Sequence, residues 1–173
     1  DDHINAGRGS DIVDGGPGDD YLFTAAGDDT VFGRDGSDTL VPTGGNNILD
    51  GGPGRDIADY RYSRDGATVD LGAGVGFGRG SDTLIGLEDI GGSRFNDRLT
   101  GDDGDNVIEA RNGDDAIAGG GGNDILKAGP GDDQVLGGDG KDVANGGSGL
   151  DVCAGERTRV CEELVEDPGD IPS

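Results

Sequence analysis

The sequence predicts an all-β chain, built from short parallel strands that stack on one another through a repeated turn. Three observations lead to this fold class. A nine-residue unit recurs along most of the chain, its eighth position is always apolar, and its turn half is dominated by glycine and aspartate. Self-similarity at a fixed period indicates a repeat architecture and outranks local signals of secondary structure.

The nine-residue units form two sets, one at residues 6–59 and one at residues 92–154. Position four is Gly in every unit except at Phe95. Position six is Asp in every unit except at Asn47 and Asn106. These fixed columns show that the units share one backbone conformation.

Position eight predicts the core. A helix would repeat its apolar residues every three or four positions, so one apolar residue in nine, flanked by outward residues, indicates a three-residue strand. The other six residues must turn the chain, and glycine adopts the left-handed backbone angles that such a turn requires. The predicted core residues are Val13, Leu22, Val31, Leu40, Leu49, Ala58, Leu99, Ile108, Ile117, Leu126, Val135, Ala144 and Cys153.

The aspartates at position six predict a metal-dependent fold. Strands stacked about 4.8 Å apart would place these carboxylates in columns. Two carboxylates about 4 Å apart repel by about 4 kcal/mol at an effective dielectric constant near 20. A divalent cation between neighbours would remove this repulsion, and a set of carboxylate and carbonyl oxygens selects Ca²⁺. A solvated linker is the alternative, but a linker needs no apolar residue in phase at position eight.

The composition fits a chain that folds only when its acid is neutralised. The 173 residues include 39 Gly, 37 Asp plus Glu and 13 Lys plus Arg, with a formal charge of −24 and a hydrophobic content of only 31%. Such a chain is expected to stay disordered in plain water. Nucleic acid and anionic membrane surfaces are poor partners for it, and no apolar run reaches the ~20 residues of a membrane span. No signal peptide is visible, so a mature product or an excised piece is expected.

The two sets of units are out of phase, because the interval between them is not a multiple of nine. Residues 60–91 are therefore an insertion, with one unit-like piece at residues 77–85 and alternating runs at 67–71 and 83–90 that predict strands. The predicted organisation is a first repeat block at 1–59, the insertion at 60–91, a second block at 92–154, and a C-terminal cap with an acidic tail at 155–173.

The motif GGxGxDxUx, in which U is apolar, resembles the repeats-in-toxin (RTX, haemolysin-type) calcium-binding repeat. The resemblance covers both sets of units and implies a right-handed parallel β-roll, a calcium-loaded β-solenoid with two units per turn. It also implies several Ca²⁺ ions, each between one loop and the loop two units later. The implied carboxylate ligands are Asp11, Asp20, Asp29, Asp38, Asp56, Asp82, Asp97, Asp115, Asp124, Asp133, Asp142 and Asp151. The implied carbonyl donors, at positions two and four, include Gly16, Gly18, Gly120, Gly122, Gly129, Gly131, Gly138 and Gly140.

Some loops depart from this pattern. Residues 81–110 resemble the divergent segment that precedes such repeats in secreted metalloproteases and adhesins, and Glu88 falls where those relatives place a calcium-ligating glutamate. Asn47 and Asn106 offer only a neutral oxygen, which implies weaker sites. The loop TAAGDD lacks the leading glycine pair and the loop GSRFND lacks the loop glycine, so calcium binding there is expected to be loose or absent.

Two cysteines lie near the C-terminus. In an oxidising compartment Cys153 and Cys161 would form one disulfide bond, which would stabilise the fold by roughly 2–3 kcal/mol. The bond would pin the tail over the open end of the core, where an exposed edge invites aggregation. In a reducing compartment the two would be idle or would pair only transiently. The alternative is a buried thiol at Cys153 and an incidental Cys161.

The expected function is that of a secreted bacterial calcium-binding module, which folds on binding Ca²⁺ and serves as a structural, stabilising or export-folding part of an extracellular protein. The alternative is an extracellular adhesion or ligand-binding module for a surface, a polysaccharide or a protein, excised from a larger enzyme. The charge of −24 argues against an acidic polysaccharide. Catalysis by the chain itself is not expected, because no Ser-His-Asp set can be built around His3, its one histidine.

One group of outward side chains could serve a partner. Tyr21, Phe23, Thr39 and Val41 are predicted to project from one face, two strands high. They mark either a docking surface for a neighbouring domain or protein, or residues that pack under the insertion. The oligomeric state is left open.

Overall fold

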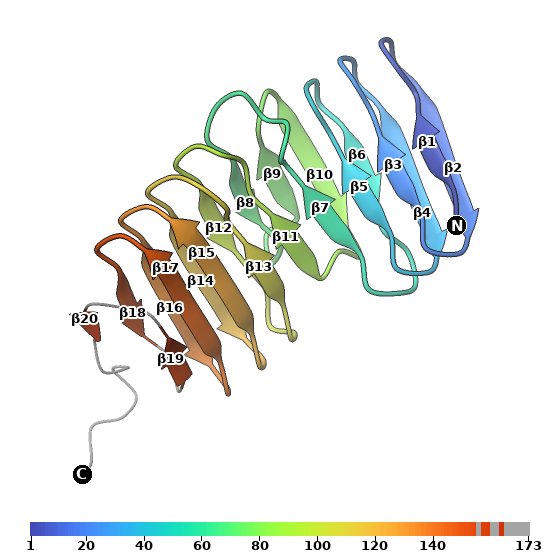
Figure 1. Cartoon of the computed structure of the whole chain (residues 1–173). Coiled ribbons are helices and arrows are strands. Elements are labelled where there is room, and N and C mark those ends of the chain that lie inside the picture. The colour runs from blue at the N-terminus through green and yellow to red at the C-terminus, as the bar shows by residue number, and fades with distance from the viewer. Residues whose placement is uncertain (155–156, 160–162, 165–173) are drawn as a thin grey trace.

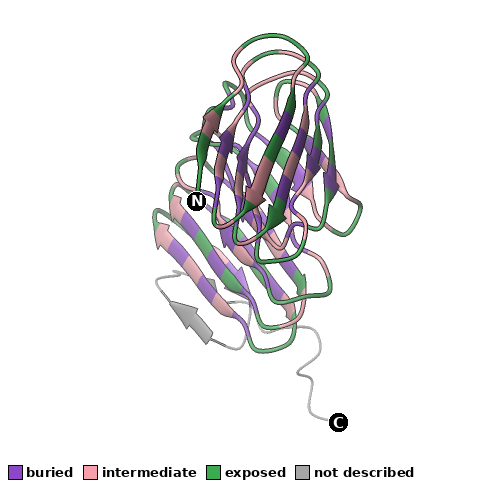
Figure 2. Ribbon diagram, turned by 90° about the vertical axis from the view of Figure 1, so that its right-hand side faces the viewer, coloured by how far each residue is buried: buried purple, intermediate pink, exposed green. Residues whose placement is uncertain are grey.

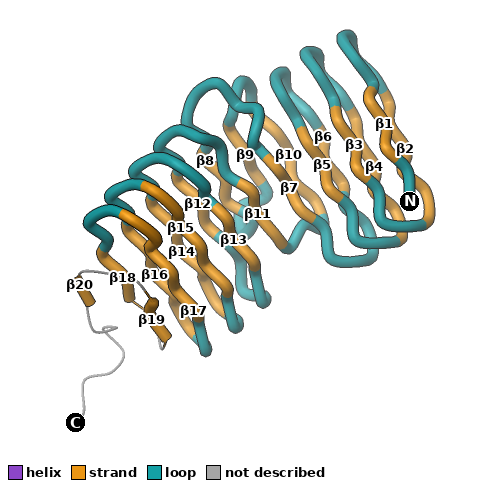
Figure 3. Tube along the Cα trace, in the orientation of Figure 1, coloured by secondary structure: helices purple, strands orange, loops and turns teal. Residues whose placement is uncertain are grey.

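The chain forms a β-solenoid of two sheets that face each other across a thin core (Figure 1). The computed structural model describes residues 1–154, 157–159 and 163–164, and within them every regular element is a β-strand. Loops lie along both edges of the stack, where the chain passes from one sheet to the other (Figure 3).

Sheet A has nine strands in the order β1-β3-β5-β7-β11-β13-β15-β17-β19. They are β1 (His3–Asn5), β3 (Tyr21–Phe23), β5 (Thr39–Val41), β7 (Ile57–Asp59), β11 (Asp89–Gly91), β13 (Val107–Glu109), β15 (Ile125–Pro130), β17 (Val143–Ser148) and β19 (Arg157–Arg159).

Sheet B has eleven strands in the order β2-β4-β6-β10-β9-β8-β12-β14-β16-β18-β20. They are β2 (Ile12–Pro17), β4 (Thr30–Asp35), β6 (Ile48–Asp50), β8 (Thr68–Asp70), β9 (Val75–Phe77), β10 (Ser81–Ile85), β12 (Arg98–Thr100), β14 (Ala116–Gly121), β16 (Gln134–Asp139), β18 (Val152–Ala154) and β20 (Glu163–Leu164).

The strand register confirms two units per turn. Leu126 of β15 pairs with Ala144 of β17, and Ile117 of β14 pairs with Val135 of β16. Each pair lies 18 residues apart in a parallel ladder, so each turn within the two repeat blocks contains two nine-residue units. The predicted all-β, parallel, β-roll architecture is therefore correct.

Most of the core is the column of position-eight side chains, and the sequence predicted this column in full. All thirteen predicted residues are buried, and Figure 2 shows buried residues alternating with more exposed ones along the strands. Each buried Leu, Ile or Val contributes about 1.5–3 kcal/mol, but Ala58 and Ala144 contribute less. One such side chain per strand makes a thin core, so the loops must add stability of their own.

The segment between β7 and β11 replaces one strand of sheet B with a three-strand meander. β10 pairs in parallel with β6 of the first block, and β8 pairs in parallel with β12 of the second block. β9 lies between them and is antiparallel to both. In sheet A, β7 and β11 pair directly, so sheet B is two strands wider than sheet A at this point.

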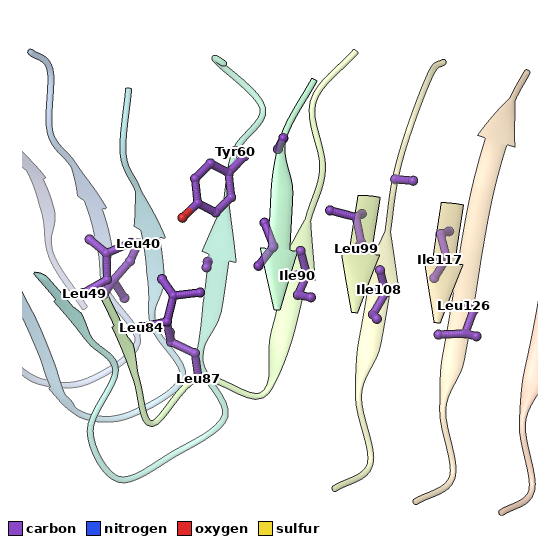
Figure 4. Close-up of a cluster of buried hydrophobic side chains, with 14 of the residues drawn as sticks. Leu40, Leu49, Tyr60, Leu84, Leu87, Ile90, Leu99, Ile108, Ile117 and Leu126 are labelled. Carbon is purple, nitrogen blue, oxygen red and sulfur yellow. The ribbon is translucent and has the colours of Figure 1, made fainter. Parts of the chain in front are cut away.

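Tyr60 fills the space that this widening creates. Its side chain is 1% exposed, and its hydroxyl donates a hydrogen bond to Asp82 Oδ2 at 2.9 Å. A Cβ atom on Gly76 of β9 would lie 1.9 Å from the Tyr60 hydroxyl, so only glycine fits beside the ring. Figure 4 shows Tyr60 with Leu84 and Leu87, two further large side chains that the meander segment adds to the core.

The repeat phase ends after β18. β19 pairs with β17 and β20 pairs with β18, so both sheets continue by one strand. The partner of Val143 is Arg157, only 14 residues away instead of 18. The rest of the predicted cap and acidic tail lies outside the described residues.

Candidate metal centre

The six-residue loops stack into two columns, one along each edge of the solenoid. Column I joins sheet B to sheet A, and column II joins sheet A to sheet B. The residues at position six, or in its place, are Asp20, Asp38, Asp56, Glu88, Asn106, Asp124 and Asp142 in column I, and Asp11, Asp29, Asn47, Asp82, Asp97, Asp115, Asp133 and Asp151 in column II.

One side-chain oxygen of each of these residues, except Asp11 and Asn106, accepts a hydrogen bond from the turn before it. The amide oxygen of Asn106 instead accepts the N–H of Asp102 in its own loop. Asp133 Oδ1 accepts the main-chain N–H of Asp115 at 2.8 Å, and Asp142 Oδ1 accepts that of Asp124 at 3.0 Å. Column I includes Glu88, whose Oε2 accepts the N–H of Asp56 at 2.9 Å. Glu88 thus stands where position six would lie in the turn that the meander interrupts.

The second carboxylate oxygen has no hydrogen-bond partner in most of the turns. These Oδ2 atoms are buried, within the described residues, at Asp11, Asp20, Asp29, Asp38, Asp56, Asp115, Asp124, Asp133 and Asp142. A buried polar atom without a partner costs about 1–3 kcal/mol, and more when it is charged. A cation bound beside each of these carboxylates would offset this cost along both edges of the solenoid.

A main-chain carbonyl lies close to the orphaned oxygen at four positions of column I, namely Asp20, Asp38, Asp56 and Asp124. At Gly119, position one of its unit, a Cβ atom would lie 2.1 Å from Asp124 Oδ2 and 2.3 Å from the carbonyl oxygen of Gly137, one turn on. Both oxygens therefore surround the same small space. The arrangement recurs at Gly15, with Asp20 Oδ2 at 2.5 Å and the carbonyl of Gly33 at 2.8 Å.

Column II is less open at this point. The nine-residue units of column I begin with glycine, whereas most of those of column II begin with a larger residue, with glycine only at Gly92 and Gly146. The larger residues are Ala6, Thr24, Pro42, Ala110 and Ala128. Thr24 and Ala110 are fully buried. Their side chains occupy the space that glycine leaves free in column I.

Burial raises the proton affinity of these carboxylates. Removal from water raises the pKa of Asp56, Asp115, Asp124 and Asp133 to about 6, and neighbouring carboxylates add to this rise while the main-chain N–H donor opposes it. Burial raises the pKa of Asp38 in the same way. The columns therefore hold negative charge at neutral pH at a cost that a nearby cation would offset.

The oxygens present fit a hard cation such as Ca²⁺. Among the described residues, no three His, Cys, Asp or Glu side chains gather into a metal-binding group. The donors that converge beside Gly119 are one carboxylate oxygen and one main-chain carbonyl oxygen. Ca²⁺ accepts carboxylate and carbonyl oxygens in flexible geometry, so the loops match its preferences.

Comparison with protein families identifies the repeat. The sequence model of the RTX calcium-binding nonapeptide repeat matches four copies, at residues 1–31, 32–59, 91–126 and 119–153, which together cover well over half of the chain. The chain belongs to the RTX calcium-binding nonapeptide repeat family. RTX nonapeptide repeats bind calcium. No curated protein matches the chain.

The predicted RTX carbonyl donors at positions two and four turn the chain within each loop. Gly120 and Gly122, for example, have φ angles of +108° and +95°, which glycine adopts without strain. Beside Asp20, Asp38 and Asp124 of column I, the carbonyl nearest the orphaned oxygen belongs to position one of the next turn, at Gly33, Gly51 and Gly137. The donor role of Gly16, Gly18, Gly120, Gly122, Gly129, Gly131, Gly138 and Gly140 stays a prediction.

Two predicted RTX ligands are already satisfied by the protein. Asp82 Oδ2 accepts the Tyr60 hydroxyl, and its Oδ1 accepts the N–H and the side-chain amide of Asn47. Asp97 accepts the main-chain N–H and hydroxyl of Ser93 at 2.6 and 2.7 Å and the N–H of Ala67 at 2.6 Å. These carboxylates lack the orphaned oxygen that marks the other turns.

An arginine makes further contacts at the junction between the two RTX blocks, where Asp82 and Asp97 also lie. Arg111 stands at position two with a φ of +86°, where most units have glycine. Its guanidinium donates to the carbonyl oxygen of Gly92 and to the fully buried carboxylate of Asp59, which also binds Arg61. At this turn a side-chain cation meets the position-one carbonyl.

A second polar ladder was not foreseen from the sequence. Asp132 Oδ1 accepts the N–H of Leu150 at 2.9 Å, and Asp114 Oδ1 accepts that of Asp132 at 3.1 Å. These position-five side chains bond to the following turn, whereas those at position six bond to the preceding turn. The signal was present as Asp or Asn at Asp19, Asp28, Asn46, Asn96, Asp105, Asp114, Asn123 and Asp132.

The predicted outward aromatic face is largely covered. Tyr21 and Phe23 are half-buried, with Arg61 over the Tyr21 ring at 6.0 Å and Tyr62 edge-on to Phe23 at 5.6 Å. Val41 is only 1% exposed, so its prediction as an outward residue is wrong. The segment after β7 folds back over this face, which favours packing under the insertion over docking of a partner.

Two further predictions concern the ends of the chain and the membrane. Cys153 is fully buried at its inward position, but Cys161 lies outside the described residues, so their pairing stays a prediction. Within the described residues no helix could cross a membrane.

Proposed function

We propose that the chain is a secreted calcium-binding module that folds when its loops bind Ca²⁺ and stabilises the extracellular protein to which it belongs. The observation that carries this proposal is the series of buried Oδ2 atoms without hydrogen-bond partners on successive turns. An enzymatic role has no comparable support among the described residues. The membership in the RTX family agrees with this function.

The loops would hold the ion between turns. In column I, Asp124 Oδ2 and the Gly137 carbonyl would contribute ligands from successive turns. A bound Ca²⁺ would supply positive charge between carboxylates that otherwise repel one another. Extracellular sites of this kind bind with Kd of about 10⁻⁴–10⁻³ M, and each filled site stabilises the folded state by mass action.

Calcium should not be needed at every turn. Asp82 and Asp97 are satisfied by Tyr60, Asn47, Ser93 and Ala67, and Arg111 holds the Gly92 carbonyl. The junction of the two blocks is therefore proposed to fold without calcium, whereas the turns on either side depend on it. At the other end, the predicted bond from Cys153 to Cys161 would add a calcium-independent staple.

Substitution of one orphaned carboxylate tests the proposed site. Asp133→Asn keeps the shape of the side chain but removes its charge, and we expect calcium affinity at that turn to fall at least about tenfold, in line with the loss of one charged ligand contact. Isothermal titration calorimetry with Ca²⁺ measures the change.

The neighbouring residue provides the matched control. Asp132→Asn makes the same chemical change on an exposed side chain, so calcium affinity should stay within about twofold of the parent. Equal losses in both variants would show that the effect is general charge reduction and would argue against a specific site at Asp133.

A further inference from the structure

A cleft lined by positively charged side chains lies beside the meander segment of this acidic chain. It has a volume of about 1040 Å³ and runs over the loops of column II, from the first block across residues 61–64 to the second block. Five arginines line it, namely Arg8, Arg61, Arg64, Arg79 and Arg94. None of the described residues in its lining is Asp or Glu, although the chain has 37 of them.

Four of these arginines have no ionic partner within the part of the chain that the structure describes. Arg61 pairs with Asp59, but Arg8, Arg64, Arg79 and Arg94 make no ion pair there, and all four side chains are exposed. By contrast, Arg34, Arg55, Arg111 and Lys127 each bind an acidic side chain.

Gathering unpaired cations in one cleft has an electrostatic consequence. A concave surface lined by one sign of charge focuses its field and concentrates ligands of the opposite sign. Arginine presents a planar fork of donors that matches carboxylate groups two bonds at a time. The net charge of −24 does not describe this cleft, which should attract anions.

Aromatic rings in the same cleft narrow the class of anion. Tyr62 is 53% exposed and stands edge-on to Phe23, and both residues line the cleft. An exposed ring beside arginines suits a ligand with an apolar C–H face next to an anionic group. A sugar ring that carries a carboxylate has both features.

Two other polyanions fit the cleft less well. Duplex nucleic acid carries one charge per about 1.7 Å and would extend past the cleft onto acidic loops. An acidic peptide in an extended conformation would pair with an unsatisfied strand edge, but the Ala26 and Gly44 main chains on this wall already bridge one another.

We propose that this cleft binds a short acidic oligosaccharide of the uronate type. Arg8, Arg64, Arg79 and Arg94 pair with its carboxylates, and one sugar face packs on Tyr62. This binding goes beyond the proposed calcium function, because the cleft uses position-three residues and the meander segment, not the carboxylates of the two columns.

The test uses the whole chain, saturated with calcium, and a trigalacturonate probe in isothermal titration calorimetry. Free Ca²⁺ is held constant and in excess, since uronates also bind the ion. The double variant Arg64→Ala/Arg79→Ala should lose at least about tenfold in affinity, and Tyr62→Ala about fivefold. A neutral trisaccharide of the same length should not bind.

Arg98→Ala is the matched control, because Arg98 is an exposed arginine on β12 outside the cleft and also makes no ion pair within the described residues. The affinity of this variant for trigalacturonate should stay within about twofold of that of the parent chain. Circular dichroism confirms that each variant is folded, and Arg94→Ala replaces the double variant if that one is not.

Several results would overturn the proposal. Absence of trigalacturonate binding by the folded chain, or an equal loss in Arg98→Ala, would remove the specific site. Tighter binding of triglutamate, or of a short oligonucleotide, would assign the cleft to a peptide or a nucleic acid instead of a glycan.

Discussion

Gly122→Ala should destabilise the chain by about 3 kcal/mol in saturating calcium, a sum of the left-handed backbone penalty and a main-chain clash. Gly122 has a φ of +95°, and a Cβ there would lie 2.5 Å from both the carbonyl carbon and the carbonyl oxygen of Gly104 in the turn before. A main-chain carbonyl cannot move aside as the end of a flexible side chain can. The turns that contain Gly104 and Gly122 must therefore move apart to accommodate the Cβ atom. Urea unfolding followed by circular dichroism measures the change.

The adjacent glycine makes this prediction specific. A Cβ on Gly121 would meet its nearest atom, Asp103 Cα, at 3.4 Å, which is an ordinary contact. Gly121→Ala should therefore change the free energy of unfolding by no more than about 0.5 kcal/mol. Equal unfolding midpoints for the two variants would contradict the stacked geometry of these loops.

Acidification should restore structure to the calcium-free chain. Burial raises the pKa of Asp56, Asp115, Asp124 and Asp133 to about 6 in the folded state, from an ordinary value of 3.8. Between these two pKa values the folded chain holds protons that the unfolded chain has released. Their contribution to stability is therefore complete below about pH 4 and is lost as the pH rises through about 6.

Circular dichroism in EDTA between about pH 7.5 and pH 4.5 measures this effect, and the folded fraction should rise as the pH falls. In saturating calcium the direction should reverse, because protons compete with the ion for the same oxygens. A calcium-free chain whose folded fraction falls on acidification would show that these carboxylates are not buried as described.

The sequence predicted the regular part of the fold because each position of the unit has one physical role. Leu22, Leu126 and their equivalents had to face inward, and the aspartates at position six had to stack, once the period was known. Glu88 was predicted as a calcium ligand by resemblance alone, and the structure places its side chain in column I, where it accepts the N–H of Asp56. Its role as a ligand stays a prediction.

The irregular part could not be predicted, because alternation reveals strands but not their partners. Residues 67–71 and 83–90 were expected to contain strands, but nothing local shows that β10 returns to β6 while β8 pairs with β12. Val41 was misplaced for the same reason, since the segment that covers its face lies in the insertion. The arginine cleft depends on this fold-back as well, because it brings Arg64 and Arg79 beside Arg8.

The side-chain ladder at position five was missed for a different reason. Asp or Asn at this position could be explained by loop composition alone, and its direction of bonding depends on the stacking distance. A role could be predicted for position six because a buried column of negative charge needs a cation. Asp114 and Asp132 at position five are exposed, so their charge alone predicts no partner.

A circular dichroism titration with calcium at neutral pH tests the central claim most directly. In EDTA the chain should show little β-structure, because the buried carboxylates of both columns repel without a cation. On addition of calcium the β-signal should rise cooperatively, with a midpoint of about 10⁻⁴–10⁻³ M. The same β-signal in EDTA and in saturating calcium would contradict the account.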